Sequence, residues 1–180
     1  MRLFAGIALD DATRRACAGA IDELQRTGFA AKFEAVDKLH VTLAFLANVE
    51  SERYAGIEHV LEDAATNTRP FTLRFDRVGA FPHERKPRIV YVGSRDQGPD
   101  FRALCARLRS GYGQLGFTFK EDAVAHVTIA RVKEPRRPLA LIEIVPIAME
   151  VRALSLFESI HDKERNTSRY EIAQRWVLKS

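Results

Sequence analysis

The residues HVTL at positions 40–43 return as HVTI at positions 126–129. Each copy stands inside an apolar run that is rich in β-branched residues, which favours a β-strand. Because residues two apart in a strand point to the same face, the histidine and the threonine of each copy should project together. The duplication therefore predicts two matching strands that present the same pair of polar side chains.

The sequence around the two copies repeats as well. We expect a strand, a helix and a strand in each half, at 2–9, 11–27 and 39–46 and again at 88–93, 99–115 and 124–131. Each predicted helix is followed by glycine and phenylalanine, and glycine is the usual left-handed residue at a helix end. This pattern indicates one domain over 1–180, built from related halves at about 1–80 and 88–178.

The segments that follow the two copies differ more. Ser51 is expected to cap a helix at 52–66, and a strand at 71–75 should continue toward Val78. In the second half, residues 137–145 hold a short helix or a loop, followed by strands at 148–157 and 170–178. Short strands with two or three helices are typical of an α+β fold with antiparallel sheets. We expect two lobes related by a pseudo-twofold axis, with the helices outside and an active-site groove between the lobes.

The composition limits the class of protein. The formal net charge of +4 favours anionic partners such as phosphate, nucleotide or RNA. No apolar run has the length of a membrane span, and the apolar N-terminal run lacks the length and cleavage site of a signal peptide. We therefore expect a cytoplasmic monomer that uses no membrane and needs no obligate protein partner.

The two cysteines, Cys17 and Cys105, stand among alanine and leucine on the predicted helices. This setting is typical of buried free thiols in a reducing compartment. A disulfide between them remains the alternative.

The two histidines favour acid–base catalysis. The ordinary pKa of histidine is near neutral, so His40 and His126 on one groove can supply a general acid and a general base. The alternative is a pair of structural histidines with satisfied ring nitrogens, but the duplication favours the catalytic interpretation. A zinc site is disfavoured because the neighbours on the same face are threonines and no Cys, Asp or Glu joins either copy. The sequence also lacks a Gly-x-Ser-x-Gly nucleophile motif and a phosphate-binding glycine loop.

A phosphodiester reaction without a metal fits this pattern best. Such a reaction needs a base on the side of the attacking group and an acid on the side of the leaving group. The hydroxyls of Thr42 and Thr128 could donate hydrogen bonds to the non-bridging phosphate oxygens and stabilise their charge in the transition state. The two copies are nearly identical, so their residues alone do not say which histidine is the acid.

These residues resemble the 2H phosphoesterases with their paired His-x-Thr-x motifs, and most closely the RNA 2′,3′-cyclic phosphodiesterases, also called 2′-5′ RNA ligases. The resemblance covers nearly the whole chain. Beyond the two histidine motifs it is carried by RLFA at 2–5, VDKLHVTLAFL at 36–46, GAFP at 79–82, PRIVYVG at 87–93, HVTIAR at 126–131 and RY at 169–170.

The resemblance implies hydrolysis of a terminal 2′,3′-cyclic phosphate on RNA, such as a tRNA fragment, to a 2′-phosphomonoester. It implies His40 as the proton donor to the leaving oxygen and His126 as the proton acceptor that activates water. It implies neither a metal nor a cofactor. It also implies 2′-5′ ligation of RNA ends as the same chemistry with a ribose hydroxyl. A phosphodiesterase for a small cyclic nucleotide and a non-catalytic RNA- or nucleotide-binding module remain alternatives.

Arg131 matches a family arginine that is expected near the phosphate, where it would bind together with Thr42 and Thr128. Simple alternation puts Arg131 on the face opposite His126, so it can reach the groove only if the strand ends or bulges there. An arginine facing solvent is the alternative. In the first copy, Phe45 stands at the matching place.

Three further features have two interpretations each. The basic loop at 81–88 could hold the RNA backbone or be a solvated connection, and the same holds for the arginines at 136–137. Phe4 and Tyr91 could stack on a base or pack in the core.

Overall fold

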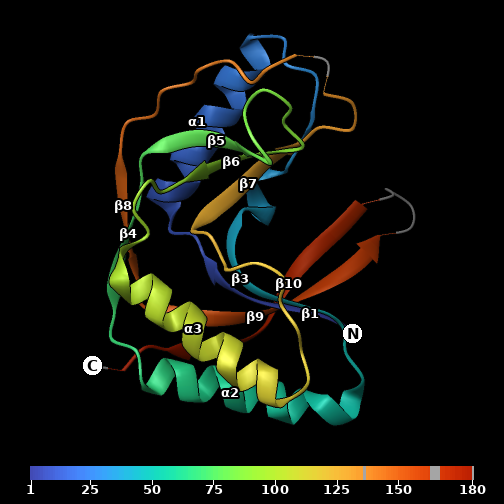
Figure 1. Cartoon of the computed structure of the whole chain (residues 1–180), viewed down its shortest axis with the longest axis vertical. Helices are drawn as coiled ribbons and strands as arrows, with labels where there is room; N and C mark the ends of the chain where they lie inside the picture. The colour runs from blue at the N-terminus through green and yellow to red at the C-terminus, as the bar shows by residue number, and fades with distance from the viewer. Residues whose placement is uncertain (136, 163–166, 180) are drawn as a thin grey trace.

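The computed structural model describes residues 1–135, 137–162 and 167–179 of the chain. Figure 1 shows the elements, which follow one another as β1 (Arg2–Ala8), α1 (Asp11–Arg26), β2 (Lys32–Phe33), the 3₁₀ turn η1 (Val36–Lys38), β3 (His40–Asn48), the 3₁₀ turn η2 (Ser51–Arg53), α2 (Tyr54–Thr66), β4 (Phe71–Phe75), β5 (Arg77–Phe81), β6 (Ile89–Gly93), α3 (Gly98–Gln114), β7 (His126–Arg131), β8 (Ile147–Val151), β9 (Ala153–Asp162) and β10 (Thr167–Val177).

One antiparallel sheet contains most of the strands. Within the described residues its order is β10-β9-β1-β3-β7-β6-β5, with β2 beside β7, while β4 and β8 form a separate two-stranded sheet. The two histidine strands, β3 and β7, meet at the centre, where the pair Val41 and Val127 joins them. Figure 1 shows the two halves of the sheet diverging from that centre, with β9 and β10 on one side and β5 and β6 on the other.

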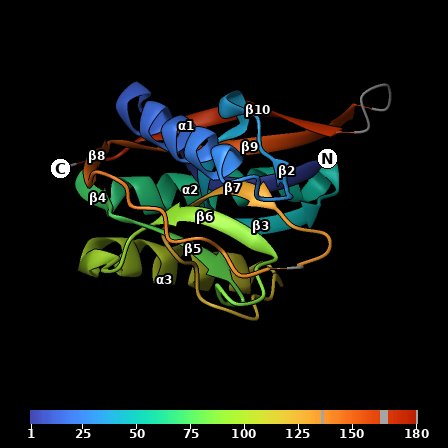
Figure 2. The same ribbon diagram turned by 90° about the horizontal axis from the view of Figure 1, so that it is seen from above.

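The repeat seen in the sequence is present in space. The units β1-α1-β3 and β6-α3-β7 correspond, and α1 packs on β7 and β8 while α3 packs on β3 and β4. Each helix therefore covers the histidine strand of the other half. Figure 2 shows α1 and α3 on opposite sides of the strands. The predicted α+β class with antiparallel sheets is confirmed, but the halves share one sheet instead of carrying one each.

The ends of the two long helices follow the predicted chemistry. The Asp10 carboxylate accepts a hydrogen bond from the Thr13 amide at 2.7 Å and so caps the first turn of α1. Gly28 and Gly116 follow α1 and α3 with φ of 67° and 83°, a conformation that glycine adopts without a steric penalty.

The start of α2 differs from the prediction. The helix begins at Tyr54, after the 3₁₀ turn η2, and Ser51 makes no cap hydrogen bond to it. The Ser51 hydroxyl donates instead to the carboxylate of Glu52 at 3.1 Å. The prediction of a Ser51 cap was wrong because the chain enters a tighter turn first, and this turn moves the helix start from residue 52 to Tyr54.

Two predicted strands are each divided in the structure. The segment 71–78 forms β4, which pairs with β8, and then β5, which pairs with β6. Likewise, the segment 148–157 divides at Arg152 into the end of β8 and the start of β9. In both places the chain passes from one sheet to the other, which alternation within a single strand does not reveal. Residues 137–145 form a loop.

The buried core connects both halves and includes fully buried Val41, Val127 and Ile129 from the histidine strands. Truncating one such aliphatic side chain to alanine typically costs about 2–5 kcal/mol of stability. Both cysteines are free, as expected, with Cys17 buried and Cys105 half-buried. Burial raises the pKa of each thiol to about 12, so both are protonated at neutral pH. Among the described residues, no helix combines the length and apolarity needed to cross a membrane.

Candidate active site

The strand β7 carries a bulge directly after its threonine. Thr128 and Ala130 pair with the consecutive residues Tyr91 and Val90 of β6, so Ile129 is the extra residue. A bulge resets the alternation of side chains along a strand. Arg131 therefore lies on the same side of the strand as His126 and Thr128. Simple alternation predicts the opposite face, and the bulge is the reason for the difference.

The strand β3 has the same bulge at the corresponding place. Thr42 and Ala44 pair with the consecutive residues Gly6 and Ala5 of β1, and Leu43 is extra. Here the residue that returns to the open face is Phe45, whose side chain is 48% exposed. The two strands therefore share a backbone geometry but present an arginine in one half and a phenylalanine in the other.

Both histidine rings are held in one orientation by the backbone. The Nδ1 atom of His40 lies 2.7 Å from the carbonyl oxygen of Lys38, and Nδ1 of His126 lies 2.8 Å from that of Val124. Because a carbonyl oxygen can only accept, Nδ1 must be the donor in each ring. This leaves Nε2 of each ring on the side away from the backbone carbonyl, where it can exchange a proton with a substrate.

The first histidine has an additional partner on its free side. His40 Nε2 lies 3.1 Å from the hydroxyl oxygen of Thr42. Within the described part of the chain, no matching hydrogen bond joins His126 to Thr128. Thr42 can therefore orient the His40 ring as well as contact a phosphate.

Aromatic rings surround the first histidine. The centroid of the His40 ring lies 4.7 Å from Phe4, 5.1 Å from Tyr170 and 5.5 Å from Phe157. Phe4 and Phe157 stack on each other at 4.8 Å. Phe4 is only 3% exposed, but it also lines the cavity described below, so its burial does not exclude contact with a base.

A smaller aromatic pair holds the second histidine. The His126 ring lies 5.2 Å from Phe81 and 5.5 Å from Tyr91, and these two rings stack at 4.5 Å. The Arg77 guanidinium donates to the Tyr91 hydroxyl at 2.5 Å and also pairs with Glu84 at 3.4 Å. Tyr91 is 5% exposed and therefore also packs in the core.

A cavity of about 400 Å³ brings these groups together. Its lining includes both histidines and both threonines of the motifs, together with Arg131 and Phe45 from beyond the bulges. Arg2, Lys38 and Tyr170 also line it, as does Glu34. The predicted site residues thus share one cavity although they come from two halves of the chain.

The electrostatic surroundings differ between the histidines. Burial lowers the pKa of His40 below its ordinary value of 6.5, and His126 and Arg131 lower that pKa further, whereas the Lys38 carbonyl and the Glu34 carboxylate raise it. The pKa of His126 is also lowered, first by burial and then by Arg131, against the effect of its own backbone hydrogen bond. Glu34 therefore favours the protonated form of His40 in particular.

Glu34 also holds the arginine of the site. Its carboxylate accepts a hydrogen bond from Arg131 Nε at 2.8 Å. Sequence reasoning missed Glu34 because the contact depends on the two-residue strand β2, in which Lys32 pairs with Arg131. So short a strand leaves no periodic pattern in the sequence.

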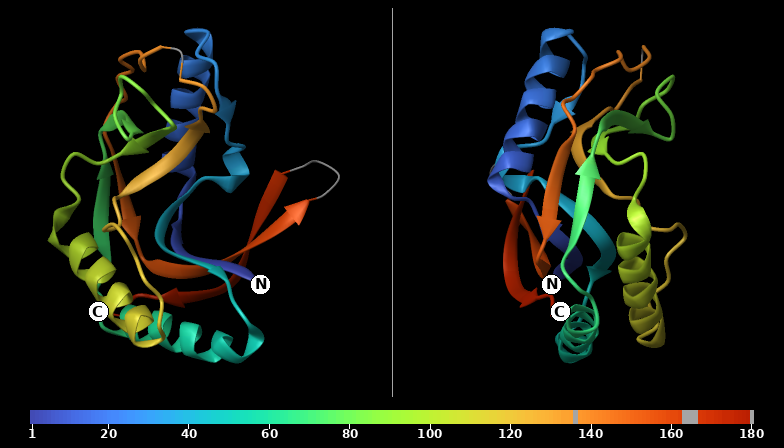
Figure 3. Two further views of the ribbon diagram at one scale, coloured as in Figure 1. Left: turned by 45° about the vertical axis from the view of Figure 1, so that its right-hand side comes forward. Right: turned by 90° about the vertical axis from the view of Figure 1, so that its left-hand side faces the viewer.

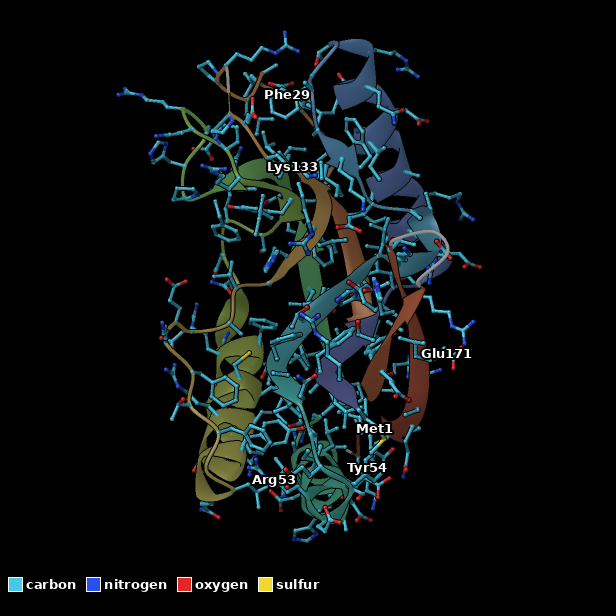
Figure 4. The ribbon with its side chains drawn as sticks, turned by 90° about the vertical axis from the view of Figure 1, so that its right-hand side faces the viewer. Met1, Phe29, Arg53, Tyr54, Lys133 and Glu171 are labelled. Atoms are coloured by element: carbon cyan, nitrogen blue, oxygen red, sulfur yellow. The ribbon has the colours of Figure 1, made fainter. Side chains whose placement is uncertain are left out.

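The other basic candidates lie away from this cavity. The described residues that line it include none of 82–88, and Arg88 of that loop donates to the carbonyl of Lys133. Arg137 donates to the carbonyl of Thr27 at 3.0 Å and lies over the ring of Phe29 at 5.6 Å. Figure 4 shows Phe29 and Lys133 together at one end of the molecule. Arg136 lies outside the described residues.

The side chains that line the histidine cavity supply acidic, basic and hydroxyl groups. In the described ranges 1–135, 137–162 and 167–179, no three His, Cys, Asp or Glu side chains gather in a way that could hold a metal ion.

Comparisons with known proteins agree on one family. A family model described as the 2′-5′ RNA ligase superfamily matches residues 12–163. The curated RNA 2′,3′-cyclic phosphodiesterase of Archaeoglobus fulgidus is 34% identical over 140 residues, which is 78% of this chain and 77% of that protein. The protein of the same name from Methanothermobacter thermautotrophicus is 31% identical over 146 residues, which is 81% of this chain and 78% of that protein.

Solved structures share the fold over its whole length. The E. coli LigT protein complexed with 3′-AMP is 25% identical with a TM-score of 0.79, and the match covers 99% of this chain and 98% of that one. The crystal structure of TT0787 from Thermus thermophilus has a TM-score of 0.87 at 24% identity, with the same coverage.

Proposed function

The chain belongs to the 2′-5′ RNA ligase superfamily, and from that premise we propose that it hydrolyses the terminal 2′,3′-cyclic phosphate of RNA to a 2′-phosphomonoester. One observation carries the proposal: two histidines, each with Nδ1 fixed by a backbone carbonyl, line one cavity with two threonines and an arginine. The curated relatives named RNA 2′,3′-cyclic phosphodiesterase support the choice of substrate.

In the proposed reaction, His126 is the general base. Its neutral Nε2 takes a proton from a water molecule as the water oxygen attacks the phosphorus of the cyclic phosphate. The lowered pKa of His126 keeps the ring neutral and able to accept this proton. General bases of this kind typically contribute about 10²–10⁴-fold to the rate.

His40 is the general acid on the leaving side. As the bond from phosphorus to the 3′ oxygen breaks, Nε2 of protonated His40 gives its proton to that oxygen, and the phosphate stays on the 2′ oxygen. Glu34 raises the pKa of His40 and so favours the protonated form that this role needs. At the end of the turnover His126 is protonated and His40 is neutral, and exchange with solvent restores both.

The remaining groups stabilise charge on the phosphate. Thr42 and Thr128 donate hydroxyl hydrogen bonds to the non-bridging oxygens, and the guanidinium of Arg131 adds a positive charge beside them. Donors that are already oriented before the reaction stabilise the transition state strongly in a site that excludes water. With an acid, a base and these donors in place, the proposed mechanism needs no metal and no cofactor.

The same groups support transfer of the phosphate to a ribose hydroxyl. If the 5′ hydroxyl of a second RNA strand takes the place of water, its oxygen bonds to the phosphorus as the bond to the 3′ oxygen breaks, and a 2′-5′ phosphodiester forms. We therefore include reversible 2′-5′ ligation of RNA ends in the proposal, with tRNA fragments as candidate substrates.

The test is turnover in the presence of a chelator. Purified protein in EDTA is incubated with a nucleoside 2′,3′-cyclic phosphate and with an oligonucleotide that ends in one, and the products are separated by chromatography against 2′- and 3′-phosphate standards. We expect the 2′-phosphate from both substrates and faster turnover of the oligonucleotide.

Three outcomes contradict parts of the proposal. A 3′-phosphate product overturns the assignment of the leaving oxygen. Activity that EDTA abolishes and a divalent ion restores overturns the metal-free mechanism. Turnover of the small cyclic nucleotide with none of the oligonucleotide overturns RNA as the substrate.

A further inference from the structure

A second hollow opens beside the histidine cavity. We call it the outer pocket; its volume is about 220 Å³, and its described lining residues are Lys32, Glu34, Lys38, Arg131, His161, Thr167, Ser168 and Tyr170. Glu34, Lys38, Arg131, Ser168 and Tyr170 line the histidine cavity as well. A ligand in the histidine cavity would therefore lie directly beside the outer pocket.

The outer pocket is formed by two groups of elements that face each other. The strands β2 and β7 and the turn η1 supply its basic side chains, and the hairpin of β9 and β10 supplies its hydroxyls. Figure 3 shows this hairpin extending away from the rest of the sheet. The Lys38 ammonium donates to the Thr167 hydroxyl at 2.9 Å, which ties η1 to the hairpin across the pocket.

The alternation of β10 keeps acidic groups off this wall. Ser168 and Tyr170 line the pocket, whereas Arg169 and Glu171 pair with each other at 3.2 Å. Figure 4 shows Glu171 on the outer side of the hairpin. The carboxylate that faces the pocket within the described residues is Glu34, and it is bonded to Arg131.

The basic groups of the outer pocket still have donors to offer. An ammonium group has three N–H donors, and the Thr167 hydroxyl takes one of those on Lys38. Arg131 uses Nε for Glu34, and none of the described hydrogen bonds uses its terminal nitrogens. Lys32 is exposed at the pocket edge. Ammonium, guanidinium and hydroxyl donors together are the usual ligands of nucleic-acid phosphates.

We propose that the outer pocket binds a second phosphate of the RNA strand, the one attached to the 5′ oxygen of the terminal nucleoside. This inference rests on the proposed function, which places the cyclic phosphate of the same nucleoside in the histidine cavity. The two phosphates of that nucleoside are separated by its ribose, and the two cavities share the wall formed by Lys38 and Arg131. The pocket makes the enzyme prefer a strand end over an isolated nucleoside without selecting a base.

The test compares two substrates that differ in this one phosphate. Wild-type protein is assayed with a nucleoside 2′,3′-cyclic phosphate that carries either a 5′ hydroxyl or a 5′ phosphate. We expect kcat/KM to be about two- to fivefold higher with the 5′ phosphate, as for a partly exposed ionic contact. Lys32→Gln should remove most of this preference, and Lys32→Glu should reverse it.

Lys32 suits this test because it lines the outer pocket and does not line the histidine cavity. Its side chain is exposed, and its part in the fold is the backbone pairing with Arg131, which the substitution retains. Turnover of the 5′-hydroxyl substrate should therefore be unchanged in Lys32→Gln. Lys179→Gln makes the same charge change at the exposed C-terminal end and should leave the preference intact.

Salt provides a second readout. Each phosphate contact to a single strand contributes about 0.7 to the slope of log affinity against log salt concentration. For an oligonucleotide that ends in the cyclic phosphate, Lys32→Gln should therefore reduce the slope of log kcat/KM by up to about 0.7, and Lys179→Gln should leave it unchanged.

The proposal is overturned if wild-type protein does not distinguish the two substrates. It is also overturned if Lys32→Gln slows both substrates equally, or if Lys179→Gln has the same effect. If wild-type protein turns over neither substrate, the proposed function has failed, and calorimetric titration decides the pocket separately. Tighter binding of a nucleoside 2′,5′-bisphosphate than of a nucleoside 2′-monophosphate, lost in Lys32→Gln, supports the pocket; equal binding of both overturns it.

Discussion

The two halves of the site share a backbone and differ in their surroundings. Each half presents a histidine and a threonine before a one-residue bulge, and each histidine is fixed through Nδ1. The first half encloses His40 with three aromatic rings, including Tyr170, whereas the second holds His126 with two and adds Arg131 beyond the bulge. In the proposed mechanism, the shared parts supply an acid and a base on one cavity, and the unequal parts distinguish the two roles.

Glu34 makes the comparison sharper. Its carboxylate raises the pKa of His40. In the described part of the chain, no acidic group has a corresponding effect on the pKa of His126. Two equivalent histidines would share a proton equally, and a carboxylate that raises the pKa of His40 favours the protonated form of that ring. In the proposed mechanism, the assignment of the acid and the base thus draws on a residue outside the repeated motif.

The largest expected effect is the loss of either histidine. His40→Ala and His126→Ala should each lower kcat for cyclic-phosphate hydrolysis by about 10²–10⁴-fold, because each removes one proton transfer. Steady-state kinetics measure the loss, and circular dichroism checks that the fold is kept. The exposed His59 on α2 is the control, and His59→Ala should retain full activity. Wild-type rates in either site variant would contradict a mechanism in which both histidines transfer a proton.

The threonines should come next. Thr42→Val and Thr128→Val should each lower kcat by about 10²-fold, because each removes a hydroxyl donor to the transition-state phosphate. Thr42→Val should also alter the pH profile, since its hydroxyl contacts His40 Nε2 at 3.1 Å. The matched Thr→Ser variants keep the hydroxyl and should restore most of the rate. Equal activity in the valine and serine variants would exclude hydroxyl donation.

A smaller effect is expected where the halves differ. Arg131→Met should raise KM about tenfold by removing a charge-assisted contact to the phosphate. Phe45→Leu, at the equivalent place in the first half, should change KM much less because it removes no charge. Initial rates over a range of substrate concentrations separate KM from kcat. Equal effects of the two variants on KM would mean that the charge of Arg131 makes no particular contribution to binding.

The smallest effect is a shift in pH dependence. The active form needs protonated His40 and neutral His126, and burial lowers both pKa values below 6.5. The rate constant kcat/KM should therefore form a bell with its maximum below pH 6.5, falling at higher pH as His40 loses its proton. Glu34→Gln should move this falling limb to lower pH, because it removes a charge that raises the His40 pKa.

Arg131→Met offers the opposite shift as a check. Arg131 lowers both histidine pKa values, so its loss should move both limbs of the bell to higher pH. A falling limb that stays in place in Glu34→Gln would show that Glu34 does not act on the general acid.

Much of this arrangement could be predicted from the sequence because it is local. The strand, helix and glycine pattern placed β1, α1, β3 and their counterparts, and the duplicated motif placed the polar face of each histidine strand. Other features depend on partners distant in the chain. The division of 71–78 and the short strand β2 both depend on which strands these segments pair with. The pattern of apolar and polar residues within a segment does not reveal its pairing partner.

Glu34 and Tyr170 illustrate the same limit within the site. Neither stands in a repeated motif, and each reaches the cavity through strand pairing: β2 with β7 for Glu34, and β10 with β9 for Tyr170. Side chains of this kind have no recurring spacing in the sequence. They nevertheless affect the protonation and the enclosure of the motif residues.

The bulge after each threonine makes strand length a functional variable. The motif extends two residues beyond its four letters, since the sixth residue, Phe45 or Arg131, lines the cavity only because one extra residue precedes it. Removing Ile129 would keep His126 and Thr128 unchanged and yet turn Arg131 outward. A relative with an intact His-x-Thr pair and a strand one residue shorter would therefore keep the acid and the base but lose the positive charge beside its phosphate.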